Sequence, residues 1–322
     1  MTYIVTGSTG LIGSALVKTL AANGDAVVAT ARNIEKARRI FGGLENVAIA
    51  EWDVVKPFDK SLLSLPSLKS LSSVCMIHAA AETASRGFVE RPVETIGTIL
   101  EGTRNVLEFA REARLGKVVF LSTMEVYGAP ATDPVTESDF GYLDPAAVRS
   151  SYPEAKRLAE NLCVAYAKEY GVDVSIARLT QTFGPGVVRG DTRVFAQFAE
   201  AVLEKRDIVL HTEGRTARCY CFIDDAVSAI LTLAEKGASG EAYNVANPAT
   251  YCTIREMAEM LAAAHPPSRV VVDLSAASGR GYAPEFKMRL STAKLEALGW
   301  RPRTGLLETF ERLVLAWKNE IR

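Results

Sequence analysis

Hydrophobic residues in the first 180 positions form short apolar runs, separated by segments in which apolar side chains recur every three or four residues. Continuous apolar runs are typical of strands buried on both faces, and the longer spacing is typical of helices. The strand-like runs are Thr2–Thr6, Ala26–Ala31, Val47–Trp52, Val74–His78, Lys117–Ser122 and Val172–Arg178. The helical segments are Leu11–Asn23, Ile34–Phe41, Val93–Arg114 and Tyr152–Tyr170. Strands that alternate with helices predict an α/β fold with a doubly wound parallel sheet.

The pattern changes after Gly184-Pro185, where strands become shorter and loops contain more Pro and Gly. Helices are still expected at Val194–Glu204 and Ile254–Ala264, with loops at Pro266-Pro267 and Ser275–Pro284. A strand followed by a helix returns at about residues 219–236. We therefore expect a first domain of residues 1–182 plus about 219–236, and a smaller C-terminal, substrate-binding domain of residues 183–218 and 237–322.

Composition narrows the choice of partners. The chain has 37 basic and 38 acidic side chains and 48% hydrophobic residues, so neither nucleic acid nor an anionic membrane is an expected partner. No apolar run is long enough for a membrane span, and the chain begins directly with a strand, which favours a cytoplasmic location. Five scattered cysteines and three histidines without ligand spacing make a metal site an unfavoured interpretation.

The segment Gly7-Ser-Thr-Gly-Leu-Ile-Gly13 joins the first strand to the first helix. Glycines at this position permit a tight turn, close approach of the backbone to a pyrophosphate, and close helix–strand packing. Free amides and the helix dipole favour phosphate at a helix N-terminus. The segment therefore predicts a Rossmann-type dinucleotide site that includes Gly7, Thr9, Gly10, Leu11, Ile12 and Gly13.

The end of the second strand bears on the choice of dinucleotide. NAD enzymes usually place a carboxylate there to bind the ribose 2′-hydroxyl, whereas this chain has Arg32. A guanidinium can pair with a 2′-phosphate that a carboxylate would repel. NADP is therefore favoured and NAD remains possible, with a solvated or adenine-stacked Arg32 as the alternative.

Tyr152 and Lys156 are one helical turn apart, so both side chains lie on one helix face. A free tyrosine titrates near ~10, and a nearby ammonium together with an oxidised nicotinamide can lower that pKa toward neutrality. Thr123 follows a buried strand and offers a hydroxyl to the reacting oxygen. These three residues are the candidate catalytic group.

The Gly-x-x-Gly-x-x-Gly spacing and the segment Leu121-Ser-Thr-Met-Glu-Val-Tyr-Gly128 resemble the extended branch of the short-chain dehydrogenase/reductase superfamily, the nucleotide-sugar epimerases, dehydratases and decarboxylases. The closing segments Ala242–Ala246 and Leu298–Pro302 extend the resemblance over the whole chain. It implies that Asp53 bonds the adenine amino group. The other residues that it places beside the cofactor are Val54, Ala79, Ala80, Ser122, Tyr152 and Lys156.

The resemblance also implies substrate contacts. Glu125 matches the acid of decarboxylases that keep Thr-x-Glu, so the resemblance makes it a fourth catalytic candidate as well as a substrate contact. Met124 replaces the second acid of the 4,6-dehydratases. Arg193 would enter the nucleotide site and Arg218 would clamp the diphosphate. Gln181 stands where the family has Asn, which puts its diphosphate contact in doubt.

The implied mechanism begins with removal of a sugar hydroxyl proton by Tyr152, assisted by Thr123, and yields a 4-keto intermediate. Epimerisation or decarboxylation of a nucleotide sugar would follow. Two alternatives stay open: an NADPH-dependent reductase of a keto-sugar or another carbonyl compound, and a cofactor sensor without catalysis. The resemblance further predicts a homodimer formed through the helices Val93–Arg114 and Tyr152–Tyr170.

Overall fold

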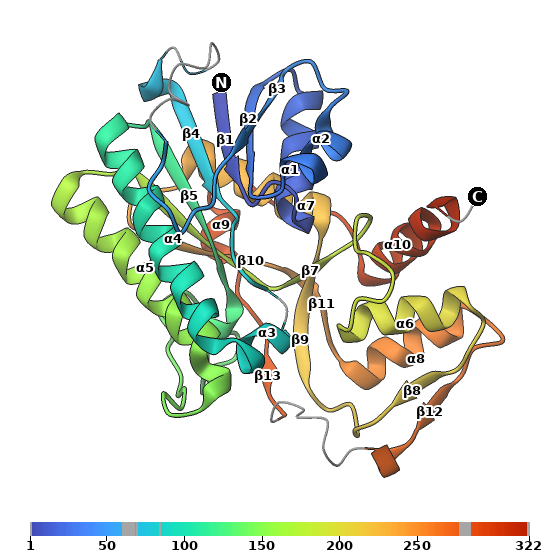
Figure 1. Ribbon diagram of the computed structural model, residues 1–322. Coiled ribbons are helices and arrows are strands. Elements are labelled where there is room, and N and C mark those ends of the chain that lie inside the picture. The colour runs from blue at the N-terminus through green and yellow to red at the C-terminus, as the bar shows by residue number, and fades with distance from the viewer. Residues whose placement is uncertain (1, 60–67, 69, 84, 277–284, 321–322) are drawn as a thin grey trace.

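The large sheet in the computed structural model is built from the apolar runs of the sequence (Figure 1). The structure describes residues 2–59, 68, 70–83, 85–276 and 285–320, so most of the predicted loop Ser275–Pro284 lies outside the described residues. Seven parallel strands have the order β10-β6-β5-β4-β1-β2-β3. They are β1 (Thr2–Thr6), β2 (Ala26–Ala31), β3 (Val47–Glu51), β4 (Val74–His78), β5 (Lys117–Thr123), β6 (Val174–Leu179) and β10 (Ala242–Val245). The predicted parallel α/β fold is confirmed.

Alternate residues of each strand enter two separate cores. In β5, Val118 and Phe120 pack on one face of the sheet, and Val119 and Leu121 pack on the other. The first face is covered by α4 (Pro92–Ala113) and α5 (Ser151–Tyr170), and the second by α1 (Leu11–Ala22), α2 (Ile34–Phe41) and α7 (Ile223–Lys236). Because both faces are covered, each strand reads as a continuous apolar run.

A smaller unit stands beside the carboxyl end of the large sheet (Figure 1). Its core lies among Phe183, Tyr220 and three helices, α6 (Val194–Leu203), α8 (Ile254–Ala264) and α10 (Leu306–Glu320). The strands are β7 (Gln181–Phe183), β9 (Ala217–Phe222), β11 (Asn247–Thr253) and β13 (Lys287–Met288), with a separate pair, β8 (Ile208–Leu210) and β12 (Val270–Val272). The remaining helices are α3 (Ser85–Glu90) and α9 (Ala293–Glu296), with short 3₁₀ turns η3 (Leu71–Ser73), η4 (Met124–Tyr127), η5 (Val148–Ser150) and η6 (Leu274–Ala276).

Most predicted boundaries agree with the structure to within one residue, and two differences are larger. β6 starts at Val174 rather than Val172, because Gly171 takes a left-handed conformation (φ 69°) and the Val172 amide still bonds the Tyr166 carbonyl at the end of α5. β10 pairs with β6 in the large sheet, although the predicted division places residues 237–322 in the smaller domain. In the segment 219–236 that we expected to return to the first domain, α7 packs on the large sheet, whereas the strand before it, β9, pairs within the smaller sheet. Among the described residues, no helix has both the length and the apolar character that crossing a membrane requires.

Candidate active site

The glycine turn leaves no room for a side chain at Gly7 or at Gly13. Gly7 has a φ of 63°, and a Cβ added there would lie 2.7 Å from the Ala80 backbone nitrogen. A Cβ on Gly13 would lie 2.2 Å from the Gly7 carbonyl oxygen. Gly10 is the N-cap of α1, which has no acidic residue in its first turn. The turn therefore fits a pyrophosphate held by backbone amides at the N-terminus of a twelve-residue helix.

The other predicted residues of the turn face different cores. Leu11 packs against the core of the smaller unit, whereas Ile12 packs against the core on the α1 face of the large sheet. Thr9 is half-buried. Leu11 thus joins the turn to the unit expected to hold substrate.

The adenosine end of the expected site is built from the ends of β2, β3 and β4. Arg32 is exposed directly after β2. Asp53 is half-buried, and Val54 is buried against α4, where the Asn105 amide donates to the Val54 carbonyl at 2.8 Å. Ala79 and Ala80 are half-buried, and the Ala80 amide donates to the Thr6 hydroxyl at 3.3 Å. The sheet therefore gathers these predicted cofactor residues at its carboxyl edge.

The candidate catalytic tyrosine is enclosed by aromatic and polar groups. The Tyr152 ring stacks on Phe88 of α3, with centroids 4.1 Å apart and planes 7° apart. Burial raises the pKa of Tyr152 above its usual value, and the Glu125 carboxylate raises it further. A hydrogen bond with Thr123 and the positive charge of Arg149 act in the opposite direction. The structure thus brings Thr123, Glu125 and Tyr152 together.

Lys156 lies one helical turn from Tyr152 and is directed toward the end of β5. Its ammonium donates to the Leu121 carbonyl at 2.7 Å and lies 4.6 Å from the Phe120 ring centroid. Burial lowers the pKa of Lys156 to about 8, and the charge of Glu160 acts against that shift. Lys156 is therefore held at the end of β5 by a hydrogen bond to the backbone and by contact with an aromatic ring.

A buried ion pair lies behind this end of β5. Arg178 of β6 makes three hydrogen bonds of 2.7–3.1 Å to Glu160 of α5, and the two side chains are 6% and 9% exposed. Ser122, which we expected beside the cofactor, donates its hydroxyl to Glu160 at 2.5 Å. Arg178 also donates to the Tyr127 hydroxyl at 3.0 Å. This network joins β5, β6, η4 and α5 beneath the candidate site.

Arg149, which the sequence did not single out, lies at the candidate site. It belongs to η5, and its Nη2 lies 2.8 and 3.1 Å from the two Glu125 carboxylate oxygens. Its guanidinium lies 4.8 Å from the centroid of Phe88, the ring that stacks on Tyr152. The three-residue spacing from Arg149 to Tyr152 is the only sequence signal of this arrangement, and it is a weak one.

The structure brings only some of the expected substrate residues close to the candidate catalytic residues. Arg218 of β9 has a buried Nε without a hydrogen-bond partner among the described residues, and Glu125 acts on it electrostatically. Arg193 is instead paired with Asp191 through contacts of 2.6–3.1 Å. Gln181 is half-buried on β7, next to Tyr220 of β9 rather than Arg218. Arg218 is thus the candidate substrate residue that the structure places near Glu125.

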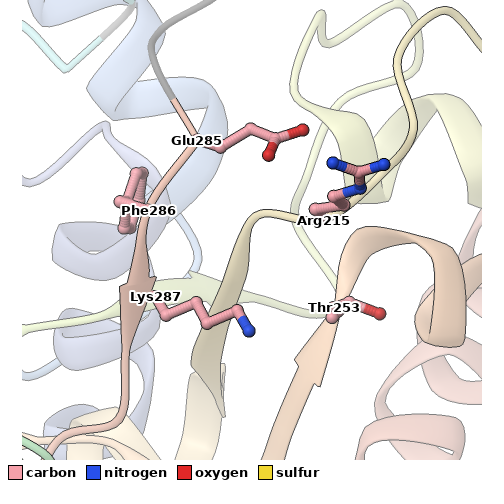
Figure 2. Close-up of a pocket in the computed structure, with 5 residues that line it drawn as sticks. All are labelled: Arg215, Thr253, Glu285, Phe286 and Lys287. Carbon is pink, nitrogen blue, oxygen red and sulfur yellow. The ribbon is translucent and has the colours of Figure 1, made fainter.

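A surface pocket of about 460 Å³ lies on the smaller unit (Figure 2). Figure 2 shows Arg215, Glu285 and Lys287 around one hollow, with the Phe286 ring on the other side of its strand. The centroid of the Phe286 ring lies 4.6 Å from Cζ of the Arg218 guanidinium. None of the candidate catalytic residues lines this pocket, so we do not assign the chemistry to it.

Comparison with known proteins identifies a family of dinucleotide-dependent enzymes. Residues 3–246 match the NAD dependent epimerase/dehydratase family. The chain is 31% identical over 324 residues to UDP-glucuronic acid decarboxylase 1 of Arabidopsis thaliana, covering 99% of this chain and 70% of the relative. It superimposes with a TM-score of 0.82 on UDP-glucose 4-epimerase from Thermotoga maritima, at 24% identity and full coverage of both chains.

A second solved structure is UDP-glucuronic acid 4-epimerase from Bacillus cereus in complex with NAD, with a TM-score of 0.80, 21% identity and full coverage of both chains. These structures share the fold, and the family match extends over most of the chain. The protein is therefore an enzyme that belongs to the NAD-dependent epimerase/dehydratase family.

Proposed function

We propose that this enzyme decarboxylates a nucleotide-linked uronic acid through a 4-keto intermediate. The observation that carries the proposal is the Glu125 carboxylate, paired with Arg149 and acting on both Tyr152 and Arg218. Similarity to UDP-glucuronic acid decarboxylases over nearly the whole chain supports the same substrate class. Catalysis at this site is therefore favoured over the alternative of a cofactor sensor.

Residues of the glycine turn, together with Asp53 and Ala80, would hold the dinucleotide. When bound, its nicotinamide supplies a hydride acceptor that later returns the hydride, and its positive charge in the oxidised form favours the Tyr152 phenolate. Tyr152 takes the proton from the C4 hydroxyl of the sugar, and Thr123 donates a hydrogen bond to the same oxygen. This assignment needs the phenolate, so the burial that raises the pKa of Tyr152 must be offset in the loaded enzyme.

Loss of carbon dioxide follows from the position of the ketone. A C4 ketone is β to the C6 carboxylate of a uronic acid. The C5–C6 bond breaks, its electron pair moves into a C4–C5 enolate, and a proton from solvent adds to C5 in place of the carboxylate. As the hydride is restored to C4, Tyr152 would give its proton back to the C4 oxygen. Hydrogen bonds from Thr123 and the protonated Tyr152 stabilise the enolate oxygen where its charge develops.

The proposed reaction is tested by replacing its base. Tyr152→Phe keeps the ring that stacks on Phe88 and removes only the hydroxyl. We expect turnover to fall at least about a thousandfold while the dinucleotide still binds, because general base catalysis and oxyanion stabilisation are both lost. Products of UDP-, TDP-, CDP- and GDP-linked sugars are identified by mass spectrometry. Wild-type turnover of none of them would contradict the proposed function.

For the cofactor we propose NADP rather than NAD, on the basis of the exposed Arg32 at the end of β2. Because the proposed reaction returns its hydride to the sugar, it causes no net oxidation or reduction, and it can use either NAD or NADP. Arg32→Ala should weaken NADP binding about tenfold or more and leave NAD binding nearly unchanged, as measured by calorimetry. An equal loss for both dinucleotides would contradict the assignment.

We also propose a homodimer and a cytoplasmic location. Exposed apolar side chains line α4 and α5, with Val93 81% and Leu158 49% exposed. An apolar helix face of this kind favours association with a second copy. Light scattering of the purified protein tests this, and a monomer at micromolar concentration would contradict it. The five cysteines are all free, which is typical of a reducing compartment.

A further inference from the structure

We propose that Arg149 is a positioning residue of the reaction: it fixes the Glu125 carboxylate beside Tyr152 and offsets its negative charge at the Tyr152 hydroxyl. The inference rests on the proposed function for its role in turnover, and its electrostatic part can be measured without substrate. No family motif used above assigns a role to Arg149.

Arg149 is held in place from two sides. Its Nη2 contacts both carboxylate oxygens of Glu125, and its guanidinium lies over the Phe88 ring. Phe88 in turn stacks on Tyr152. The Ser151 hydroxyl donates to the Phe88 carbonyl at 2.9 Å, which ties α3 to the start of α5. Phe88 therefore contacts both Arg149 and Tyr152, and Arg149 in turn contacts Glu125.

The charges around Tyr152 oppose one another. Glu125 disfavours the phenolate and Arg149 favours it. Without Arg149, the Glu125 carboxylate would lose its nearest positive partner. It would then disfavour the phenolate form of the buried Tyr152 more strongly. Because Arg149 contacts Glu125 directly, the positive charge that favours the phenolate lies beside the negative charge that disfavours it.

Other ionisable groups surround this pair. Lys156 lies one turn along α5 from Tyr152 and is directed to the Leu121 carbonyl, and Arg218 of β9 interacts with Glu125. Arg86 and Glu90 of α3 form an exposed pair with each other. Arg149 is the cation that contacts Glu125 directly, so its removal should change the local charge most.

Stability is not the main contribution of this pair. The side chains of Arg149 and Glu125 are 38% and 30% exposed, and ion pairs with that much solvent contact contribute little to folding. A structural role would leave the ionisation of Tyr152 unaltered. The proposed role predicts a change in ionisation with little change in stability.

The chain offers a matched control. Arg312 of α10 pairs with Glu308 at 2.6 Å, lies 5.0 Å from the Phe222 ring centroid and is 48% exposed. Arg312→Met therefore removes the same kinds of contact as Arg149→Met, away from the candidate site. Arg149→Lys keeps the positive charge at this position, and Glu125→Gln removes the negative charge that opposes it.

The experiment titrates Tyr152 in the protein loaded with oxidised dinucleotide. The phenolate signal is the ultraviolet absorbance of each protein minus that of its Tyr152→Phe counterpart. Arg149→Met should raise the apparent pKa of Tyr152 by about one unit, since a single adjacent charge shifts a pKa by that order. The acid limb of the pH profile of kcat/KM should move by the same amount.

The other variants give the outcomes that decide the proposal. Arg149→Lys and Arg312→Met should keep the wild-type pKa, Glu125→Gln should lower it, and Glu125→Gln combined with Arg149→Met should bring it back toward wild type. An unchanged pKa in Arg149→Met, or an equal rise in Arg312→Met, would overturn the proposal. If Arg149→Met fails to fold, an unchanged pKa in Glu125→Gln overturns it instead. Failure to turn over any nucleotide sugar would affect only the proposed function.

Discussion

Replacing Arg178 with methionine removes one partner of the buried ion pair beneath the candidate site. Glu160 would lose three hydrogen bonds of 2.7–3.1 Å and keep the hydrogen bond from the Ser122 hydroxyl and the electrostatic interaction with Lys156. Because the Glu160 side chain is only 9% exposed, solvent cannot replace the guanidinium. Breaking a buried pair in this way costs about 3–5 kcal/mol of folding free energy.

The double variant sharpens this prediction. Arg178→Met combined with Glu160→Leu removes both charges, so it should be more stable than Arg178→Met by about 1–3 kcal/mol. Arg189→Met, which breaks an exposed pair with Glu204, should cost at most about 1 kcal/mol.

Equilibrium unfolding in urea, followed by circular dichroism and by tryptophan fluorescence, measures the three free energies. Catalytic rates of the folded variants show whether the network also supports Lys156, four residues before Glu160 on α5. A loss below about 1 kcal/mol in Arg178→Met would refute the reasoning. So would a double variant less stable than Arg178→Met.

Two further predictions concern His78 at the end of β4 and Gly13 in the first turn of α1. Burial lowers the pKa of His78 to about 3 from 6.5, so the unfolded chain binds the proton first and stability falls as the pH drops below 6.5, by about 3 kcal/mol at pH 4.5. Urea unfolding at several pH values should show this slope in wild type and a weaker one in His78→Asn; equal slopes would exclude His78 as its source. Gly13→Ala should abolish dinucleotide binding, because its Cβ would lie 2.2 Å from the Gly7 carbonyl oxygen, and calorimetry showing wild-type affinity would contradict the tight turn.

The large sheet could be predicted because strands that are buried on both faces consist mostly of apolar residues. Val118–Leu121 is apolar at every position, and the structure sends alternate residues to opposite cores. β10 was less visible because it has only four residues and its place is decided by pairing with β6, far away in the sequence. Local pattern identifies a strand more readily than it identifies a neighbour in the sheet.

The candidate site could be predicted where spacing alone fixes geometry. Tyr152 and Lys156 share a helix face by periodicity, but spacing could not show that the Lys156 ammonium is directed to the Leu121 carbonyl. The Arg149–Glu125 pair joins residues 24 positions apart on two separate 3₁₀ turns. Contacts of this kind depend on tertiary packing, which a single sequence does not display.

The central claim is that the enzyme breaks the bond between C5 and C6 of a nucleotide-linked uronic acid. UDP-glucuronic acid labelled with ¹³C at C6 tests it most directly, with NMR following the label in the presence of each dinucleotide. We predict that the label appears in carbon dioxide and bicarbonate, and that Tyr152→Phe abolishes its release. Turnover in which the label stays in a uronic acid of altered C4 configuration would contradict decarboxylation and indicate an epimerase.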